Sequence, residues 1–398
     1  MAKDDVTSNM PRSGEGMGIS KHEYRDRVRK LAELSGREGF EAVLLTGESN
    51  IEYFSGFRHH APWTLFARPF FQIITADGRS VLLTHRFLEP EMRRTSAIDD
   101  IRLYSQSGNA PVELLKDILN QFGIRRGRLG MELGCEQRLG ISLLDFRRLE
   151  MELTDLSTAD ASDAIWRLRM IKSPAERQLM RRSAEITAKA FDECFKTARP
   201  GMTEEDVARV AAETMVTNGA ERPGFILIAS GRENYHILSG KPTQRRLEKG
   251  DMLWMDMAAV YRGYWSDFCR AAYFGNPSPE IEERQKLILD VNQAAIAAVA
   301  NGARVRDIAA AAVRAFRNHG IEISLGLNRI GHGMGLMSTE PPHVALYDET
   351  ICEEGLAFTI EPRIVSTEGI FNCEELIFVT ATGAEVVRSA PRNITYIT

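Results

Sequence analysis

The chain has few cysteines, no long apolar run and no excess of positive charge. Its five cysteines are dispersed and form no CxxC pair, which argues against a disulfide framework and fits a reducing compartment. No stretch approaches the roughly 20 apolar residues that span a bilayer, and residues 1–17 lack the apolar region of a secretory signal. The net charge of −5 gives no electrostatic case for nucleic acid. These absences predict a cytoplasmic protein with neither a nucleic-acid nor a membrane partner.

The composition is that of an ordinary globular protein, with 43% hydrophobic and 26% charged residues. Residues 1–17 have no periodicity, which predicts a disordered tail. Residues 18–158 alternate helical patterns with short apolar strands, and we expect a compact α/β domain there. Within it, EAVLLTG predicts a buried strand, and FFQIITADGRSVLLT predicts two strands joined by an Asp-Gly turn.

Residues 159–398 predict a second domain, of α+β class and built on an antiparallel sheet. Ser173 is suited to cap a helix that starts with Pro174, carries Glu176 three residues after the cap and runs to about Thr197. Thr203 predicts a second capped helix. Strands with hairpin turns follow, then two helices near 280–300 and 304–319, then more strands.

Two aspartates in the segment LWMDMAAVYRGYWSDFCRAAYFG suggest a metal site. Asp256 lies inside an apolar strand, where a carboxylate is costly unless it is paired or bound to metal. Asp267 follows 11 residues later, past a turn at Arg262-Gly263. A hairpin there would bring the two aspartates roughly opposite each other. Two adjacent carboxylates repel, and divalent metal ions commonly hold such pairs together.

A second carboxylate pair and one histidine extend this pattern. Glu361 and Glu374 flank a turn in FTIEPRIVSTEGIFNCEELIFVT, and His332 lies between glycines in RIGHGMGL. Four carboxylates and one imidazole suit Mn, Co, Zn or Fe, and two bridged ions can activate water at neutral pH. Each residue alone is more often a hydrogen-bonded structural group than a ligand, so the prediction depends on the joint pattern.

This order of residues resembles the pita-bread metallopeptidases, which include methionine aminopeptidase, Xaa-Pro aminopeptidase, prolidase and the creatinase relatives. The order is Asp, 11 residues, Asp, then GHG-x-G, then IEP, then a Glu-acid pair, supported by IKSPAE, RPGMTEEDV and LEKGDMLWMD. SNIEYFSGF resembles the N-terminal domain of the prolidase and creatinase branch. The resemblance implies a pita-bread catalytic domain preceded by a smaller α/β creatinase-type domain.

By this resemblance two divalent metal ions, Mn first among the candidates, are bound by Asp256, Asp267, His332, Glu361 and Glu374. Asp267 and Glu374 would bridge the ions, whereas Glu375 is not counted as a ligand. A homodimer is also expected.

The resemblance also implies substrate-binding and catalytic residues. Glu361 would move a proton to the leaving nitrogen. His236 falls where the family has a substrate-contacting histidine, although it could be an ordinary loop residue. His343 could equally line the site or lie on a surface loop. Arg68, in an aromatic segment, could clamp a substrate carboxylate or simply pack between domains.

One departure affects the substrate. Peptidase members commonly have a second histidine seven residues after the ligand histidine, and here that position is Thr339. A threonine can hydrogen-bond to substrate but cannot act as an imidazolium.

Three functions follow as hypotheses. The first is hydrolysis of an amide C–N bond in a short peptide, in the manner of an Xaa-Pro dipeptidase or aminopeptidase. The second is creatinase-like hydrolysis of a small non-peptide amide or amidino compound, which Thr339 favours. The third is a non-catalytic binding module, which the complete set of five ligand residues disfavours.

Overall fold

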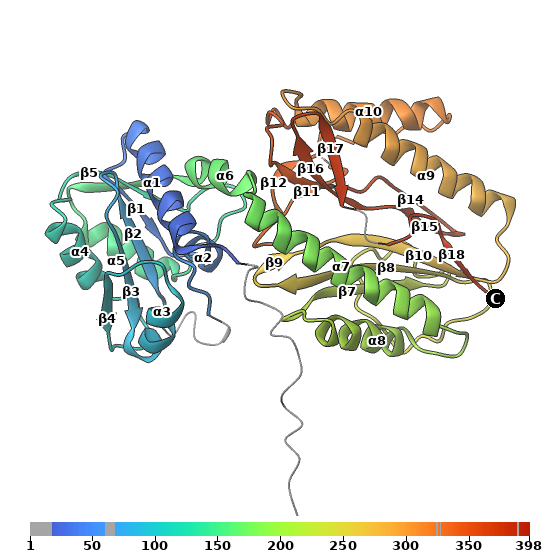
Figure 1. Cartoon of the computed structure of the whole chain (residues 1–398), viewed down its shortest axis with the longest axis horizontal. Helices are drawn as coiled ribbons and strands as arrows, with labels where there is room; N and C mark the ends of the chain where they lie inside the picture. Colours follow the sequence, from blue (N-terminus) through green and yellow to red (C-terminus); the bar gives the residue numbers. More distant parts are fainter. Residues whose placement is uncertain (1–17, 60–67, 324, 327, 388–389) are drawn as a thin grey trace, which may run out of the picture.

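A computed structural model describes residues 18–59, 68–323, 325–326, 328–387 and 390–398. The predicted tail at 1–17 lies outside these residues. Figure 1 shows two bodies, an N-terminal one in blue to green that ends with α6 and a C-terminal one in green to red that begins with α7.

The N-terminal body is a mixed six-stranded sheet with strand order β4-β3-β2-β1-β5-β6. Its elements are α1 (Lys21–Arg37), β1 (Ala42–Leu45), α2 (Glu48–Ser55), β2 (Phe71–Thr75), β3 (Ser80–His85), η2 (Arg86–Leu88), α3 (Glu89–Thr95), β4 (Ile101–Tyr104), α4 (Val112–Gln121), β5 (Gly127–Met131), α5 (Leu143–Glu152), β6 (Leu156–Asp160) and α6 (Ser162–Met170).

Both faces of this sheet are covered, because β1 alternates between two cores. Val43 and Leu45 pack with residues of α1 and α2, whereas Ala42 and Leu44 pack with residues of α4 and α5. Successive side chains of a strand point to opposite faces of the sheet, so this alternation buries both faces. The expected buried strand and the β2–β3 hairpin at Asp77-Gly78 are confirmed.

The C-terminal body contains two sheets, β18-β10-β8-β7 with β9 on its edge, and β12-β11-β13-β16-β17, together with the β14–β15 hairpin. Its elements are α7 (Pro174–Thr197), α8 (Glu204–Thr217), β7 (Arg222–Ser230), β8 (Met252–Tyr261), β9 (Tyr264–Trp265), β10 (Phe268–Phe274), α9 (Pro279–Ala297), α10 (Val305–Asn318), β11 (His332–Gly333), β12 (Glu340–His343), β13 (Ala357–Ile360), β14 (Arg363–Ser366), β15 (Gly369–Asn372), β16 (Glu375–Thr380), β17 (Gly383–Val387) and β18 (Thr395–Ile397).

The helices of this body begin where the sequence predicts. Ser173 accepts from the Glu176 backbone, and the Glu176 carboxylate accepts in return from Ser173, which completes a capping box. Thr203 forms the same arrangement at α8. Apart from the parallel β10–β18 pair, the ladders are antiparallel. The predicted α+β class is thereby confirmed.

Alternation along β8 decides which side chains face the space between the sheets. Leu253, Met255 and Met257 pack in the core under α7 and α8, whereas Met252 and Trp254 pack in the core shared with α9, α10 and the second sheet. Asp256 has the same parity as Trp254, so its carboxylate projects toward the second sheet.

Candidate metal centre

The β8–β10 hairpin carries the two aspartates. Its turn requires positive φ at Arg262 (48°) and Gly263 (84°), where glycine is favoured. The register pairs Asp256 with Cys269, and Asp267 immediately precedes β10. The aspartates are therefore diagonal neighbours on one face of the hairpin, two positions from the directly opposite pairing that the sequence suggests.

Glu361 and Glu374 lie opposite each other between the second sheet and the β14–β15 hairpin. Ile360 pairs with Glu375 on one side of them, and Arg363 pairs with Asn372 on the other. Both pairings follow the same register, which places Glu361 directly opposite Glu374. This is the arrangement that the predicted hairpin requires. Glu374 is 1% exposed.

His332 enters the site from β11, between two glycines that the packing requires. A Cβ on Gly331 would lie 1.9 Å from the Thr359 carbonyl oxygen, and one on Gly333 would lie 2.0 Å from that of Pro341. The imidazole Nδ1 is 3.0 Å from the Gly333 carbonyl oxygen, and Nε2 lies 3.7 Å from both Asp267 Oδ2 and Glu361 Oε1. A proton on Nδ1 leaves the Nε2 lone pair directed at the carboxylates.

Four of the five predicted ligands, together with Cys269, form two overlapping groups, and Glu361 lies beside them with its Oε1 3.7 Å from His332 Nε2. Ligand atoms of Asp256, Cys269 and Glu374 lie within 4.8 Å of one another, and so do those of Asp267, His332 and Glu374. Glu374 belongs to both groups. Such an arrangement offers two adjacent cation positions with one shared carboxylate.

The buried carboxylates of the cluster would be stabilised in their ionised form by a nearby positive charge. Burial and the charge of Glu361 raise the pKa of Asp256 to about 7. Burial and neighbouring carboxylates likewise raise the pKa values of Asp267 and Glu374 well above their ordinary range. Burial lowers the pKa of His332 although Glu361 opposes the shift, which favours the neutral imidazole that can bind metal.

Buried carboxylate oxygens that lack a hydrogen-bond donor also indicate a cation site. Asp256 Oδ1, Asp267 Oδ1 and Glu374 Oε1 are buried and accept no hydrogen bond from the described part of the chain. Buried carboxylate oxygens are costly unless a donor or a cation meets them. The residues present therefore fit divalent metal ions.

The predicted substrate-binding residues are spread more widely. His343 pairs with His332 across β11 and β12, and its ring lies 2.7 Å from Arg329 and 3.4 Å from Glu136. Thr339 is half-buried on the connection between these strands, and His236 is exposed in the loop after β7. Their contacts with substrate stay predictions.

Arg68 lies in the N-terminal body, where its guanidinium stacks over the Phe87 ring at 4.9 Å. Part of the aromatic segment around it, residues 60–67, lies outside the described residues. A clamp between Arg68 and a substrate carboxylate also stays a prediction.

Sequence reasoning missed Cys269 and the charged residues Arg169 and Glu340. Cys269 could have been found, because it follows Asp267 by two positions and therefore shares its face of β10. Arg169 and Glu340 are buried and paired with each other. No local pattern connects residues so far apart in sequence.

No helix in the described part of the chain combines the length and the apolar character needed to cross a membrane.

Comparison with known proteins defines the class. The model of metallopeptidase family M24 matches residues 178–381, just over half of the chain, and the chain belongs to this family. The creatinase/prolidase N-terminal domain model matches residues 27–171. The protein is therefore a metal-dependent peptidase that hydrolyses amide bonds, with a pita-bread catalytic domain preceded by a creatinase-type domain, as the sequence predicts.

The individual relatives agree with this class. The Xaa-Pro dipeptidase of Pyrococcus horikoshii is 28% identical over 371 residues, covering 93% of this chain and 98% of that protein. The crystal structure of the prolidase from the same organism superposes with a TM-score of 0.77 at 25% identity, covering 92% and 99% of the two chains. X-Pro aminopeptidase from Thermotoga maritima gives a TM-score of 0.79 at 25% identity, covering 93% and 99%.

Proposed function

We propose that this chain is an Xaa-Pro dipeptidase or aminopeptidase that uses two metal ions held by Asp256, Asp267, His332, Glu361 and Glu374. The observation that carries the proposal is the membership of Glu374 in both donor groups, because one shared carboxylate suits two neighbouring cations. Full-length similarity to Xaa-Pro dipeptidases supports the substrate class.

When bound, the metal ions would supply Lewis acidity toward the scissile carbonyl and lower the pKa of water. Glu361 accepts the proton of the attacking water and delivers it to the leaving nitrogen, so that water is added across the C–N bond. His332 stays neutral in its buried setting and does not compete for that proton. His236 and His343 are the proposed contacts to the substrate, one from an exposed loop and one from β12.

The donor set favours manganese. Four carboxylates and one imidazole form an oxygen-rich set, which suits Mn more than a thiophilic ion, while Co, Zn and Fe remain alternatives. Metal removal with a chelator, followed by reconstitution with each ion, should give the highest activity with Mn. Retention of full activity in metal-free protein would contradict the proposal.

Two variants test the residue roles. Asp267→Ala should lose activity and metal together. Glu361→Gln should lower kcat by about 10²–10⁴-fold, since an amide cannot take up the proton. Metal analysis and Xaa-Pro dipeptide hydrolysis measure both effects. An Asp267→Ala protein with wild-type metal content would exclude Asp267 as a ligand.

A second function is favoured by Thr339. A threonine cannot supply the imidazole that steadies a peptide carbonyl in the peptidases this chain resembles, and this change suits a creatinase-like hydrolase of small amides or guanidino acids. A panel of Xaa-Pro dipeptides and such compounds separates the two functions by kcat/KM.

The homodimer and the cytoplasmic location stay predictions. Light scattering on the purified protein and fractionation of cells test them.

A further inference from the structure

The connection between β11 and β12, residues 334–339, follows the strand that carries His332 and contacts β9, the strand just before Asp267. We call it the 334–339 loop. Trp265 donates from its backbone to the Gly335 carbonyl oxygen at 2.9 Å and from its indole to that of Leu336 at 3.0 Å. Trp265 precedes Asp267 by two positions, and His332 precedes the first residue of the loop, Met334, by two positions. The loop therefore links the backbone next to one candidate ligand with the backbone next to the other, through the hydrogen bonds of Trp265.

Glu340 closes this loop. Its backbone pairs with Gly333, and its carboxylate accepts from the Met337 backbone at 3.1 Å. The same carboxylate contacts the Arg169 guanidinium and lies 3.2 Å from Lys172 Nζ. Glu340 is 1% exposed. Burial opposes its ionisation, but Arg169 and Lys172 outweigh it and hold the pKa of Glu340 below its ordinary value.

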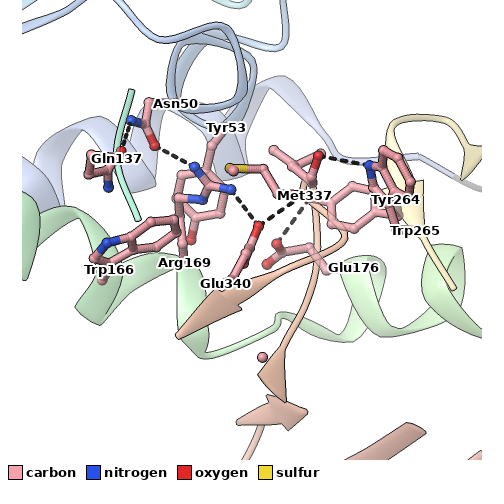
Figure 2. Close-up of polar contacts among 12 residues, drawn as sticks. Asn50, Tyr53, Gln137, Trp166, Arg169, Glu176, Tyr264, Trp265, Met337 and Glu340 are labelled. Carbon is pink, nitrogen blue, oxygen red and sulfur yellow. Dashed lines mark hydrogen bonds and ion pairs between the residues drawn. The ribbon is translucent and has the colours of Figure 1, made fainter. Parts of the chain in front are cut away.

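Arg169 extends this contact into the N-terminal body, as Figure 2 shows. Its Nη1 donates to Asn50 Oδ1 at 2.5 Å, while the other end of the guanidinium contacts Glu340. Asn50 in turn donates to Glu132 at 2.6 Å, and Glu132 is buried at the end of β5. A continuous hydrogen-bonded line therefore runs from the N-terminal sheet to the 334–339 loop.

A second line reaches the other side of the same loop. Arg27 on α1 lies 3.2 Å from Glu176 in the first turn of α7, and Glu176 accepts from the Tyr264 hydroxyl at 3.0 Å. Tyr264 and Trp265 together form β9, the strand that holds the loop carbonyls. The N-terminal body therefore holds both the loop and the strand that contacts it.

We propose that Glu340, held by Arg169 and Lys172, is a positioning residue that fixes the 334–339 loop and thereby sets His332 against Asp267 for metal binding. The inference rests on the ligand set proposed above. It also assigns the N-terminal body a part in preorganising the metal site. A buried ionic group gains little net stability over apolar residues of similar volume, so stability alone does not account for this cluster.

The test is a comparison of metal affinity and thermal stability in purified full-length protein. Glu340→Gln keeps the shape of the side chain but removes its charge. The matched control is Glu204→Gln, which alters a carboxylate 2% exposed and bonded to Ser230 and Thr243, remote from the 334–339 loop. Isothermal titration of metal-free protein with Mn²⁺ gives Kd, and differential scanning fluorimetry gives Tm.

We expect Glu340→Gln to raise the Mn²⁺ Kd by about 10–100-fold, the range for groups that orient metal ligands. Glu204→Gln should lower Tm by a similar amount but leave the Mn²⁺ Kd within about twofold of the wild-type value. Trp265→Phe keeps an aromatic ring and the backbone donor but removes the indole N–H. It serves if Glu340→Gln fails to fold, and it should also raise Kd.

Two results would overturn the inference: an unchanged Kd in both Glu340→Gln and Trp265→Phe, or an equal rise in Glu204→Gln. Failure of the ligand set itself is distinguishable, because then Asp267→Ala would bind Mn²⁺ as tightly as the wild type.

Discussion

Asp256 on β8 is paired directly with Cys269 on β10, and the thiol lies with Glu374 beside the Asp256 carboxylate. Cys269 is fully buried, and burial together with the charge of Asp256 raises the pKa of its thiol well above the ordinary value. The cluster therefore contains a neutral thiol enclosed among carboxylates. A thiol of this kind is inert, because the thiolate is the reactive form.

Thiol titration should reflect this burial. Cys135 is exposed, and the other four cysteines are buried. A chromogenic disulfide reagent should modify one thiol in the native protein and all five after denaturation. Cys135→Ser should reduce the native count to none. Rapid modification of any thiol in native Cys135→Ser protein would contradict the burial of the other four cysteines.

Thr339 allows a test of substrate choice. If the missing imidazole limits peptide hydrolysis, Thr339→His should raise kcat/KM for an Xaa-Pro dipeptide at least about tenfold, since a positioned acid–base group contributes about 10²–10⁴-fold. Metal Kd is measured in parallel, because Thr339 lies in the 334–339 loop and a changed Kd would show that the substitution disturbs the metal site. Thr339→Val is the control, and it should give no gain. Equal rates in all three proteins would show that this position does not limit the reaction.

Glu52 predicts a pH dependence of stability. Burial raises its pKa to about 8, although Arg58, at 3.6 Å, opposes the shift. Because the folded pKa lies above the unfolded one, its stabilising contribution is complete below about pH 4.5 and is lost as pH rises through 8. Glu52→Gln removes this titration.

The measurement is Tm at pH 6 and pH 9. The wild type should lose about 2–4 °C relative to Glu52→Gln over this interval, because the raised pKa corresponds to about 2–3 kcal/mol between pH 6 and pH 8. The exposed Glu193→Gln is the control and should follow the wild type. Parallel curves for Glu52→Gln and wild type would contradict the shifted pKa.

The capping box at Ser173 predicts a local effect on stability. Ser173→Ala removes the acceptor of the Glu176 backbone N–H, and such a loss costs about 1 kcal/mol. Ser173→Asp, which retains an acceptor, should keep most of the stability. Urea unfolding monitored by circular dichroism gives both values. A wild-type midpoint for Ser173→Ala would mean that the cap contributes nothing.

Much of the fold and all five candidate ligands could be predicted from short stretches of sequence. Caps, apolar alternation and the Arg262-Gly263 turn depend on interactions within a few residues, so their signals are local. Asp256 and Glu361 are carboxylates within apolar stretches, which is unusual, so they too could be recognised from the local sequence. The sequence did not predict the contacts of His236 or Arg68, because a loop position alone does not specify which surface a side chain meets.

The spacing and chemistry of the donor residues were determined by the sequence alone, and they were sufficient to predict a two-metal hydrolase. Tertiary structure decided three other features: the pairing of Asp256 with Cys269, the shared position of Glu374, and the buried contact of Arg169 with both Asn50 and Glu340. Those last partners are 119 and 171 residues from Arg169 in sequence. Contacts at such separations depend on how the two bodies and the two sheets pack, and packing is a property of the whole chain.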